Sequence, residues 1–338
     1  MDRDYLFYGI IGAAVIALAA VAATGLMPHE PADPVVYIVY GSEKGDLSYT
    51  DSAYRGLAAA QHDLSVTTKE FTPRDYETLP QLLNSAGGSE KPGLIITVGF
   101  QYTSFTRDLA RQHPEIRFLA IDQSGTGSDN LRATEITSYG DSYLAGVLAA
   151  SATKTGRIGI IMGMKTDLLD TFMLGYTAGA RAVNASVTVD HAYVRQDSPA
   201  GFTDPGQAGR ISEGMYRNGT DVIFTCAGIS NMGAFEAANT TPGRYVIGTD
   251  SDQSPYGPAF VLASAIKRVD RVVYTGIAEY LNGSFTGGEQ VSGFSDGATG
   301  IVFNPAFAAY NETVRAREEN AQLEEETYLA SRAVPVQQ

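Results

Sequence analysis

The sequence is poor in the residues that hold metals and disulfides. It contains one cysteine, four histidines and no tryptophan in 338 residues. Because Cys226 has no second cysteine to pair with, the chain can form neither an internal disulfide nor a cysteine cluster around a metal. The histidines lie far apart in the sequence, whereas metal sites need grouped ligands. The sequence therefore predicts no metal and no cofactor.

Positive charge is also scarce. The chain has 24 lysines and arginines against 38 aspartates and glutamates, a formal net charge of -14 at pH 7. A nucleic-acid surface needs clustered lysines and arginines, so the composition argues against a nucleic-acid partner. With 44% hydrophobic residues the chain can bury a large core, and its length exceeds the length at which one core usually keeps growing. Two lobes are therefore expected.

A recognisable catalytic set is missing as well. No serine lies in a recognisable arrangement with a histidine and an acid. The glycine-containing segment at 41–56 lacks the Gly-Lys-Ser/Thr of a phosphate-binding loop. Paired acids leave a glycosidase open as an alternative, but the sequence favours a binding protein over an enzyme.

The N-terminus carries a long uncharged segment. Residues 5–27 contain no charged side chain, which at about 1.5 Å per helical residue is enough to cross a hydrocarbon core of about 30 Å. Arg3 favours an orientation with the body outside the membrane. We predict a single-pass anchor at 1–27, with a cleavable signal peptide as the alternative, and then a proline-rich spacer at 28–34. No cysteine ends the segment, so attachment through a lipidated cysteine is excluded.

After the spacer, apolar β-rich runs alternate with segments of helical period. Such alternation is typical of βαβ units with a parallel sheet, and it occurs twice, on either side of a helix predicted at 141–152. It favours two α/β lobes around a cleft over one long sheet. Strands are predicted at 35–40, 94–98, 118–121, 157–162, 187–194, 221–226 and 245–249. The acidic segment 311–338 is predicted to be a surface helix or a tail.

Two of the predicted strands end in acids. Asp250 and Asp252 follow the apolar run that begins at Tyr245, and Asp122 follows the run that ends at Ile121. In open parallel sheets, ligands bind at the carboxyl ends of the strands. We expect one of Asp250 and Asp252 to accept hydrogen bonds from a ligand and the other to cap a turn. For Asp122 the same two roles stay open.

Two aromatic residues lie in polar segments. Tyr49 comes just before a predicted helix, and Phe202 lies in a loop between a strand and a helix. From opposite lobes they would enclose a flat ring, each stacking contact contributing about 0.5–1.5 kcal/mol beyond burial; the alternative is that they pack onto the core. Lys267, in a helix predicted to start near Ser264, is a candidate donor to a ligand rich in hydroxyls.

Several ordered motifs resemble the basic membrane protein family, which includes purine nucleoside receptors that serve as substrate-binding components of ABC transporters. The motifs are Gly45-Asp46-Leu47-Ser48-Tyr49, Ser142-Tyr143-Leu144-Ala145-Gly146, Lys154-Thr155-Gly156-Arg157-Ile158-Gly159, Phe172-Met173-Leu174-Gly175-Tyr176-Thr177-Ala178-Gly179, Asp221-Val222-Ile223-Phe224, Gly248-Thr249-Asp250-Ser251-Asp252-Gln253 and the segment 264–270. The resemblance implies a type I periplasmic-binding-protein fold, whose two lobes are joined by three crossovers and close on the ligand. We expect 35–140 and 255–280 to form the first lobe, and 141–254 and 281–310 the second.

The resemblance also implies roles for single residues. Tyr49 and Phe202 hold the positions of the two aromatic residues that sandwich a purine in the family. Asp122 would contact the ligand from the first lobe, Gly228 would line the second, and Asp46 would lie at the start of the binding loop.

The same comparison assigns the sugar end of the site and shows one departure. Asp250 and Lys267 correspond to residues that bind ribose hydroxyls in the family. Thr50 stands where the family has an asparagine, and one hydroxyl replaces an amide that offers both a donor and an acceptor. A pyrimidine nucleoside or a flavin such as riboflavin therefore stays open beside a purine nucleoside.

Taken together, the residues and the resemblance predict an extracytoplasmic solute-binding protein, tethered to the cell membrane, that captures a nucleoside for an ABC permease. One alternative is the ligand-binding ectodomain of a sensor, which would use the same site. Another is an enzyme that acts on a nucleoside.

Overall fold

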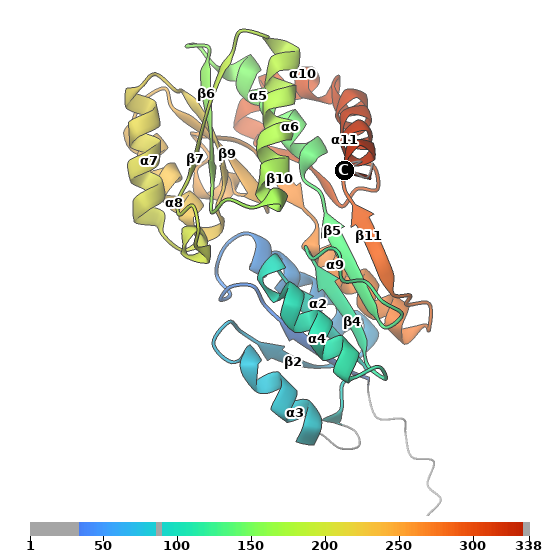
Figure 1. Ribbon diagram of the computed structural model, residues 1–338. Helices are drawn as coiled ribbons and strands as arrows, with labels where there is room; N and C mark the ends of the chain where they lie inside the picture. Colours follow the sequence, from blue (N-terminus) through green and yellow to red (C-terminus); the bar gives the residue numbers. More distant parts are fainter. Residues whose placement is uncertain (1–33, 86–89, 334–338) are drawn as a thin grey trace, which may run out of the picture.

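The structure, a computed structural model, describes residues 34–85 and 90–333. It contains two α/β lobes, the first below the second in Figure 1, each built around a six-stranded sheet. The first sheet contains β1 (Val35–Val39), β2 (Thr67–Phe71), β3 (Leu94–Val98), β4 (Arg117–Ile121), β5 (Leu131–Ile136) and β11 (Gly288–Ser292). The second contains β6 (Arg157–Met162), β7 (Thr188–Tyr193), β8 (Val222–Cys226), β9 (Tyr245–Asp250), β10 (Val261–Lys267) and β12 (Thr299–Phe303).

The two sheets have corresponding strand orders. The first runs β11-β5-β4-β3-β1-β2 and the second β12-β10-β9-β8-β6-β7. Neighbouring strands are parallel except β10 and β12, which are antiparallel. All residues of β3 and β8 are buried, because helices cover both faces of each sheet and leave no polar side for these strands. The predicted two-lobed α/β architecture is confirmed.

Helices pack on both faces of each sheet (Figure 1). The first lobe carries α2 (Tyr49–Leu64), α3 (Leu79–Ser85), α4 (Thr103–Gln112) and α9 (Val269–Leu281). The second carries α5 (Tyr139–Ala152), α6 (Asp167–Val183), α7 (Pro205–Arg217), α8 (Asn231–Thr240), α10 (Asn311–Arg315) and α11 (Glu318–Ala333). Apolar side chains on the two faces of each sheet form separate core clusters.

The chain crosses between the lobes after β5, after β10 and after β11, which corrects the expected lobe boundaries. The sequence places 255–280 in the first lobe, but β10 pairs with β9 in the second sheet. It places 281–310 in the second lobe, but β11 pairs with β5 in the first sheet. The second crossover comes at the end of β10 and not before 255, because the short segment after β9 returns the chain alongside that strand.

The helix predicted from about Ser264 is wrong at its start. Ser264 and Lys267 belong to β10, and α9 begins only at Val269. Alanine and lysine are common in helices, so the local composition does not indicate a strand. The small side chains at 263–265 let β10 lie between β9 and β12, and this pairing overrides local propensity.

The C-terminal helix α11 lies over the crossovers, where the sequence predicts a surface helix or a tail. The Glu325 side chain is buried and accepts hydrogen bonds from the backbone N–H groups of Gly140 (2.9 Å) and Phe294 (2.8 Å). These two residues belong to the first and third crossovers. The ring of Tyr328 stacks on Tyr139 with centroids 4.6 Å apart, so α11 binds the connections between the lobes.

Contacts from α11 also reach the first lobe. Arg332 forms an ion pair with Glu135 of β5, although the rest of the helix packs on α5. A side chain at Gly140 or Gly293 would meet the Glu325 carboxylate at 3.0 Å or 2.5 Å, so glycine is required at both crossovers for the carboxylate to fit.

The predicted anchor at 1–27 and residues 28–33 of the spacer lie outside the described residues. Within the part of the chain that the structure describes, no helix is long and apolar enough to cross a membrane.

Candidate ligand-binding cleft

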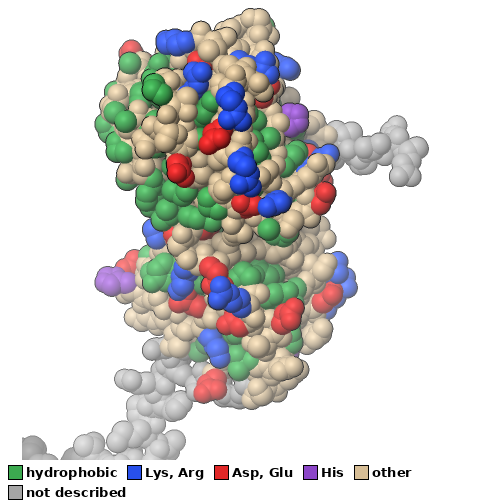
Figure 2. Space-filling model, turned by 90° about the vertical axis from the view of Figure 1, so that its left-hand side faces the viewer, with side chains coloured by type: hydrophobic (Ala, Val, Ile, Leu, Met, Phe, Trp, Pro, Cys, Tyr) green, Lys and Arg blue, Asp and Glu red, His purple; other side chains and the backbone are tan. Residues whose placement is uncertain are grey.

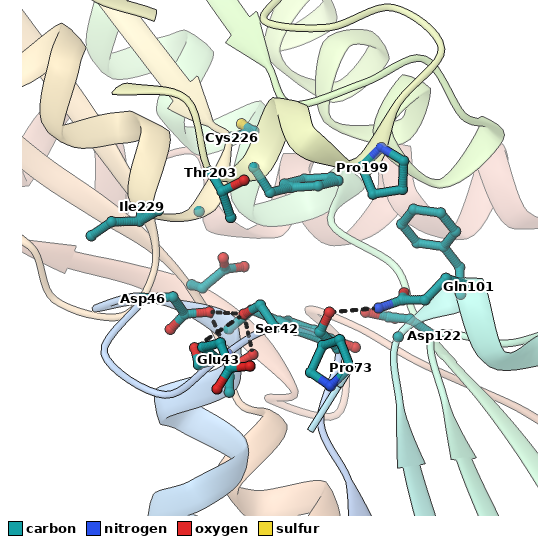
Figure 3. A pocket seen from close by; sticks show the side chains of 18 of the residues that line it. Ser42, Glu43, Asp46, Pro73, Gln101, Asp122, Pro199, Thr203, Cys226 and Ile229 are labelled. Carbon is teal, nitrogen blue, oxygen red and sulfur yellow. Dashed lines mark hydrogen bonds between the residues drawn. The ribbon is translucent and has the colours of Figure 1, made fainter. Parts of the chain in front are cut away.

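A cavity of about 540 Å³ lies between the lobes, at the carboxyl ends of both sheets. The waist between the lobes is visible in Figure 2, where hydrophobic side chains gather along the lower edge of the upper lobe. Figure 3 shows side chains from both lobes that line the cavity. Parallel α/β sheets offer their ligands this edge. The predicted residues that line it are Asp46, Tyr49, Thr50, Asp122, Phe202, Gly228, Asp250 and Lys267.

Aromatic side chains line the cavity from both lobes. Tyr49 opens α2 in the first lobe, and Phe202 ends a short 3-10 helix in the second. Phe202 packs its ring against Gly163, where a Cβ atom would lie 2.5 Å from the ring carbons. Phe100 of the first lobe lies 6.4 Å from Phe202 between ring centroids. Phe100 is not among the site residues predicted from the sequence, although it lies just after β3 as Asp122 lies just after β4.

Tyr49 also contacts the charged part of the cavity. The Nζ atom of Lys267 lies 5.5 Å from the centre of the Tyr49 ring, within the range of a cation–π contact. Burial raises the pKa of the Tyr49 hydroxyl well above its ordinary value, and the nearby Asp122 carboxylate raises it further. The phenol therefore keeps its proton and can donate a hydrogen bond.

A buried ion pair forms the floor of the cavity. The Nζ atom of Lys267, the last residue of β10, lies 2.7 Å from Oδ2 of Asp122, and their side chains are 3% and 2% exposed. Asp122 has a left-handed backbone with φ of 56°, and its Oδ1 accepts a hydrogen bond from Ile136 N at 3.0 Å. Since Asp122 follows β4 and Lys267 ends β10, the pair joins the two lobes beside the crossovers.

Asp250 is the corresponding acid of the second lobe. It ends β9 with φ of 65° and is buried. Its Oδ2 accepts a hydrogen bond of 2.5 Å from Ser48 Oγ in the first lobe. Burial raises the pKa of the Asp250 carboxyl to about 6, while Lys267 and Ser48 act in the opposite direction. Asp250 can therefore take up a proton close to neutral pH.

Asp46 fixes the beginning of α2. Its carboxylate accepts hydrogen bonds from Ser48 N (3.0 Å), Thr50 N (2.8 Å) and Asp51 N (3.1 Å). These amides have no acceptor inside the first helical turn, so the carboxylate acts as an N-terminal cap. The cap orients Tyr49 and Thr50 at the wall of the cavity.

Of the last two predicted site residues, Gly228 lines the cavity and Asp252 does not. Gly228 lines the cavity with φ of 56°, and a Cβ atom there would lie 3.2 Å from the Phe202 carbonyl oxygen. Asp252 is exposed and does not line the cavity. Its Oδ1 accepts hydrogen bonds from Ser254 N (3.0 Å) and Ser254 Oγ (2.7 Å), so Asp252 caps a turn and Asp250 is the acid that faces the cleft.

Residues 34–337 match the family model described as "ABC transporter substrate-binding protein PnrA-like". The chain belongs to the Bmp family. Basic membrane protein D of Borreliella burgdorferi (strain JD1) is 31% identical over 267 residues, 77% of this chain and 76% of that protein. The ABC transporter nucleoside-binding protein BmpA of Lactococcus lactis subsp. cremoris is 29% identical over 313 residues, 84% of this chain and 88% of that protein.

A solved structure supports the same fold for this Bmp family member. An ABC transporter system solute-binding protein from Aeropyrum pernix K1 superimposes with a TM-score of 0.72 at 26% identity, covering 87% of this chain and 86% of that one. As a Bmp protein, the chain is an ABC transporter substrate-binding protein of an extracytoplasmic family.

Among the described residues, no three side chains of histidine, cysteine, aspartate or glutamate are placed to hold a metal ion. Cys226 lines the cavity, and burial raises the pKa of its thiol well above the ordinary value. It therefore lies in the cleft as a neutral thiol.

Proposed function

We propose that this protein captures a nucleoside, with purine nucleosides preferred, and presents it to an ABC permease. One observation carries the proposal. Asp122 and Asp250, buried acids at the ends of corresponding strands in the two lobes, line the same cavity as the aromatic side chains of Tyr49 and Phe202. A nucleoside has a flat ring for the aromatic walls and vicinal hydroxyls for the carboxylates. The printed name of the Lactococcus lactis relative, a nucleoside-binding protein, supports the same ligand class.

In the proposed complex, Tyr49 and Phe202 stack on the two faces of the base. Asp250 accepts hydrogen bonds from the ribose hydroxyls, which a carboxylate binds more strongly than a neutral acceptor does. Lys267 opposes the rise in the pKa of Asp250 that burial causes, and Asp122 anchors Lys267.

The remaining predicted residues complete the proposed site. Gly228 lets the backbone of the second lobe approach the ligand, and Asp46 caps the first turn of α2, which carries Thr50. Ligand contacts from both lobes favour the closed arrangement, because they exist only when the lobes meet.

The proposal includes membrane attachment through residues 5–27, whose sequence alone supports it. An anchor there would hold the body beside the permease at the outer surface of the membrane. The permease then receives the ligand from the closed receptor.

Isothermal titration of the full-length protein in detergent tests the ligand class. The panel contains purine nucleosides, pyrimidine nucleosides, free bases, riboflavin and ribose. We expect purine nucleosides to bind more tightly than their free bases or ribose, because each fragment satisfies one half of the site. Binding of riboflavin alone, or of no nucleoside, contradicts the proposal. Conversion of a nucleoside to base and sugar shows an enzyme instead.

Phe202→Ala is expected to weaken nucleoside binding about five- to tenfold, because it removes one stacking wall worth about 0.5–1.5 kcal/mol in addition to its buried area. The same titration measures the change. Leu174→Ala is the matched control, since Leu174 is 45% exposed on α6 outside the cavity. Equal affinities of the two variants would remove Phe202 from the site.

Affinity is expected to fall as pH drops through about 6, the pKa of Asp250. Ligand hydroxyls bind the ionised carboxylate, so affinity is complete above this pKa and is lost below it. Between pH 7 and pH 5 the dissociation constant should rise about tenfold. Asp250→Asn should bind weakly with little dependence on pH in this range, and a wild-type affinity that stays flat contradicts the role of Asp250.

In the unliganded protein, the effect of Asp250 on the stability of the fold depends on pH in the opposite direction to its effect on ligand affinity. The raised folded-state pKa means that ionised Asp250 costs stability. Its contribution to stability is therefore complete below its ordinary pKa and is lost as pH rises through about 6.

A further inference from the structure

Ser42 and Thr50 form a pair of hydroxyl groups on the first-lobe wall of the cavity. Ser42 follows β1 and Thr50 lies in the first turn of α2, and both line the cavity. Their oxygens Oγ and Oγ1 lie 2.7 Å apart. Ser42 Oγ also lies 3.2 Å from Asp46 Oδ2 and 3.4 Å from the Glu43 carbonyl oxygen. Figure 3 shows Ser42 beside Asp46 at this wall.

The Thr50 hydroxyl uses its one proton to donate a hydrogen bond to Ser42. A hydroxyl group has one proton to donate, and Thr50 is fully buried. In the part of the chain that the structure describes, Ser42 Oγ is the hydrogen-bonding partner of Thr50 Oγ1. Because a buried donor without an acceptor is destabilising, Thr50 donates to Ser42.

The proton of Ser42 is committed as well. Its other neighbours are the Asp46 carboxylate and the Glu43 carbonyl oxygen, which both offer acceptors. Ser42 therefore donates to one of them, and the direction of the chain is from Thr50 to Ser42 to an acceptor. Ser42 is only partly buried, so an oxygen lone pair is what it offers to the cavity.

The cations on this wall are already paired. Arg74 Nε lies 3.1 Å from Glu43 Oε1, and Lys44 Nζ lies 2.7 Å from Glu70 Oε2. Both cations line the cavity with Ser42. Each cation on this wall therefore contacts an acid, and the groups nearest the Ser42 hydroxyl are the acceptors of Asp46 and Glu43.

We propose that Ser42 determines specificity by requiring an N–H donor on the edge of the base that meets it. The inference rests on the proposed nucleoside function and deepens it. An amide at position 50 could donate to a ring nitrogen or accept from an N–H group, whereas the Ser42–Thr50 pair can only accept from an N–H or O–H group. Bases that carry a ring N–H or an exocyclic amine can donate a hydrogen bond to Ser42.

Purine riboside tests the proposal, because it lacks base N–H groups and is no larger than adenosine or inosine. In titrations of the full-length protein, we expect adenosine or inosine to bind at least about tenfold more tightly than purine riboside, since the analogue leaves the Ser42 acceptor unpaired. In Ser42→Ala this ratio should fall to near one. Ser85→Ala, at an exposed serine that ends α3, is the control and should keep the wild-type ratio.

Thr50→Val separates the two hydroxyls. It removes the Thr50 proton but leaves Ser42 able to donate to Asp46 and accept from the base, so the preference should persist. If adenosine, inosine and purine riboside bind the wild-type protein equally, the role of Ser42 is overturned while nucleoside binding stands. If none of the three binds, the purine receptor function is overturned, and the inference with it.

Discussion

Replacing Lys267 with methionine is expected to lower the free energy of unfolding by about 3–5 kcal/mol, the usual cost of removing one partner from a buried ion pair. The Nζ atom of Lys267 lies 2.7 Å from Asp122, with both side chains almost completely buried. Methionine fills the space of the lysine stem but leaves the Asp122 carboxylate without its counter-ion. Urea denaturation followed by circular dichroism measures the difference, and nucleoside binding should be lost as well.

Two further variants show whether charge is the cause. Lys267→Met combined with Asp122→Asn should recover much of the lost stability, because no unpaired charge then remains. Lys91→Met breaks a surface pair with Glu115, whose side chains are 38% and 50% exposed, and should cost less than about 1 kcal/mol. If Lys267→Met is no more destabilising than Lys91→Met, the buried pair does not have the importance assigned to it.

Glu325→Ala is expected to lower the free energy of unfolding by about 2–4 kcal/mol. The change leaves the backbone N–H groups of Gly140 and Phe294 without their acceptor, and each unsatisfied buried donor costs about 1–3 kcal/mol. The variant should also become easier to cleave at the crossovers by protease, because Glu325 joins two of them. Chemical denaturation and limited proteolysis provide the two measurements.

The neighbouring Glu324 supplies the control for this experiment. It lies on the same turn of α11 and is exposed, so Glu324→Ala should change stability by less than about 0.5 kcal/mol. Glu325→Gln keeps one acceptor oxygen and should fall between the two. Equal stability of all three variants would show that the Glu325 carboxylate does not hold the crossovers together.

Local sequence predicts those parts of the fold that depend on burial along one segment. The strand predicted at 94–98 coincides with β3, and the helix predicted at 141–152 lies within α5. Continuous apolar runs and helical periodicity are properties of each segment, so they can be read without knowing its neighbours. For the same reason, Asp122 and Asp250 could be placed at strand ends.

Contacts between distant segments account for what the sequence does not predict. Lys267 ends a strand because β9 and β12 flank it, not because its own segment favours extended structure. Glu325 is an acid in a polar, acidic helix, and the crossovers bury it. The sequence around Phe100 does not mark it as a site residue, because its role depends on Phe202 of the other lobe, which lies close to it. Asp250 and Asp252 both come at the end of the same apolar run. The turn of the chain after β9 leaves Asp250 in the cavity and Asp252 exposed.

The position of β11 has a consequence for how the protein is made. This edge strand of the first sheet, residues 288–292, follows nearly the whole second sheet in the chain, and it places Gly288 beside Arg132. During synthesis the first lobe cannot complete its sheet until this strand has left the ribosome. A nascent chain that stops before residue 288 exposes the edge of β5, where another strand can pair. We therefore expect such fragments to aggregate in a sedimentation assay in detergent, whereas the full chain, in which β11 covers the edge of β5, does not.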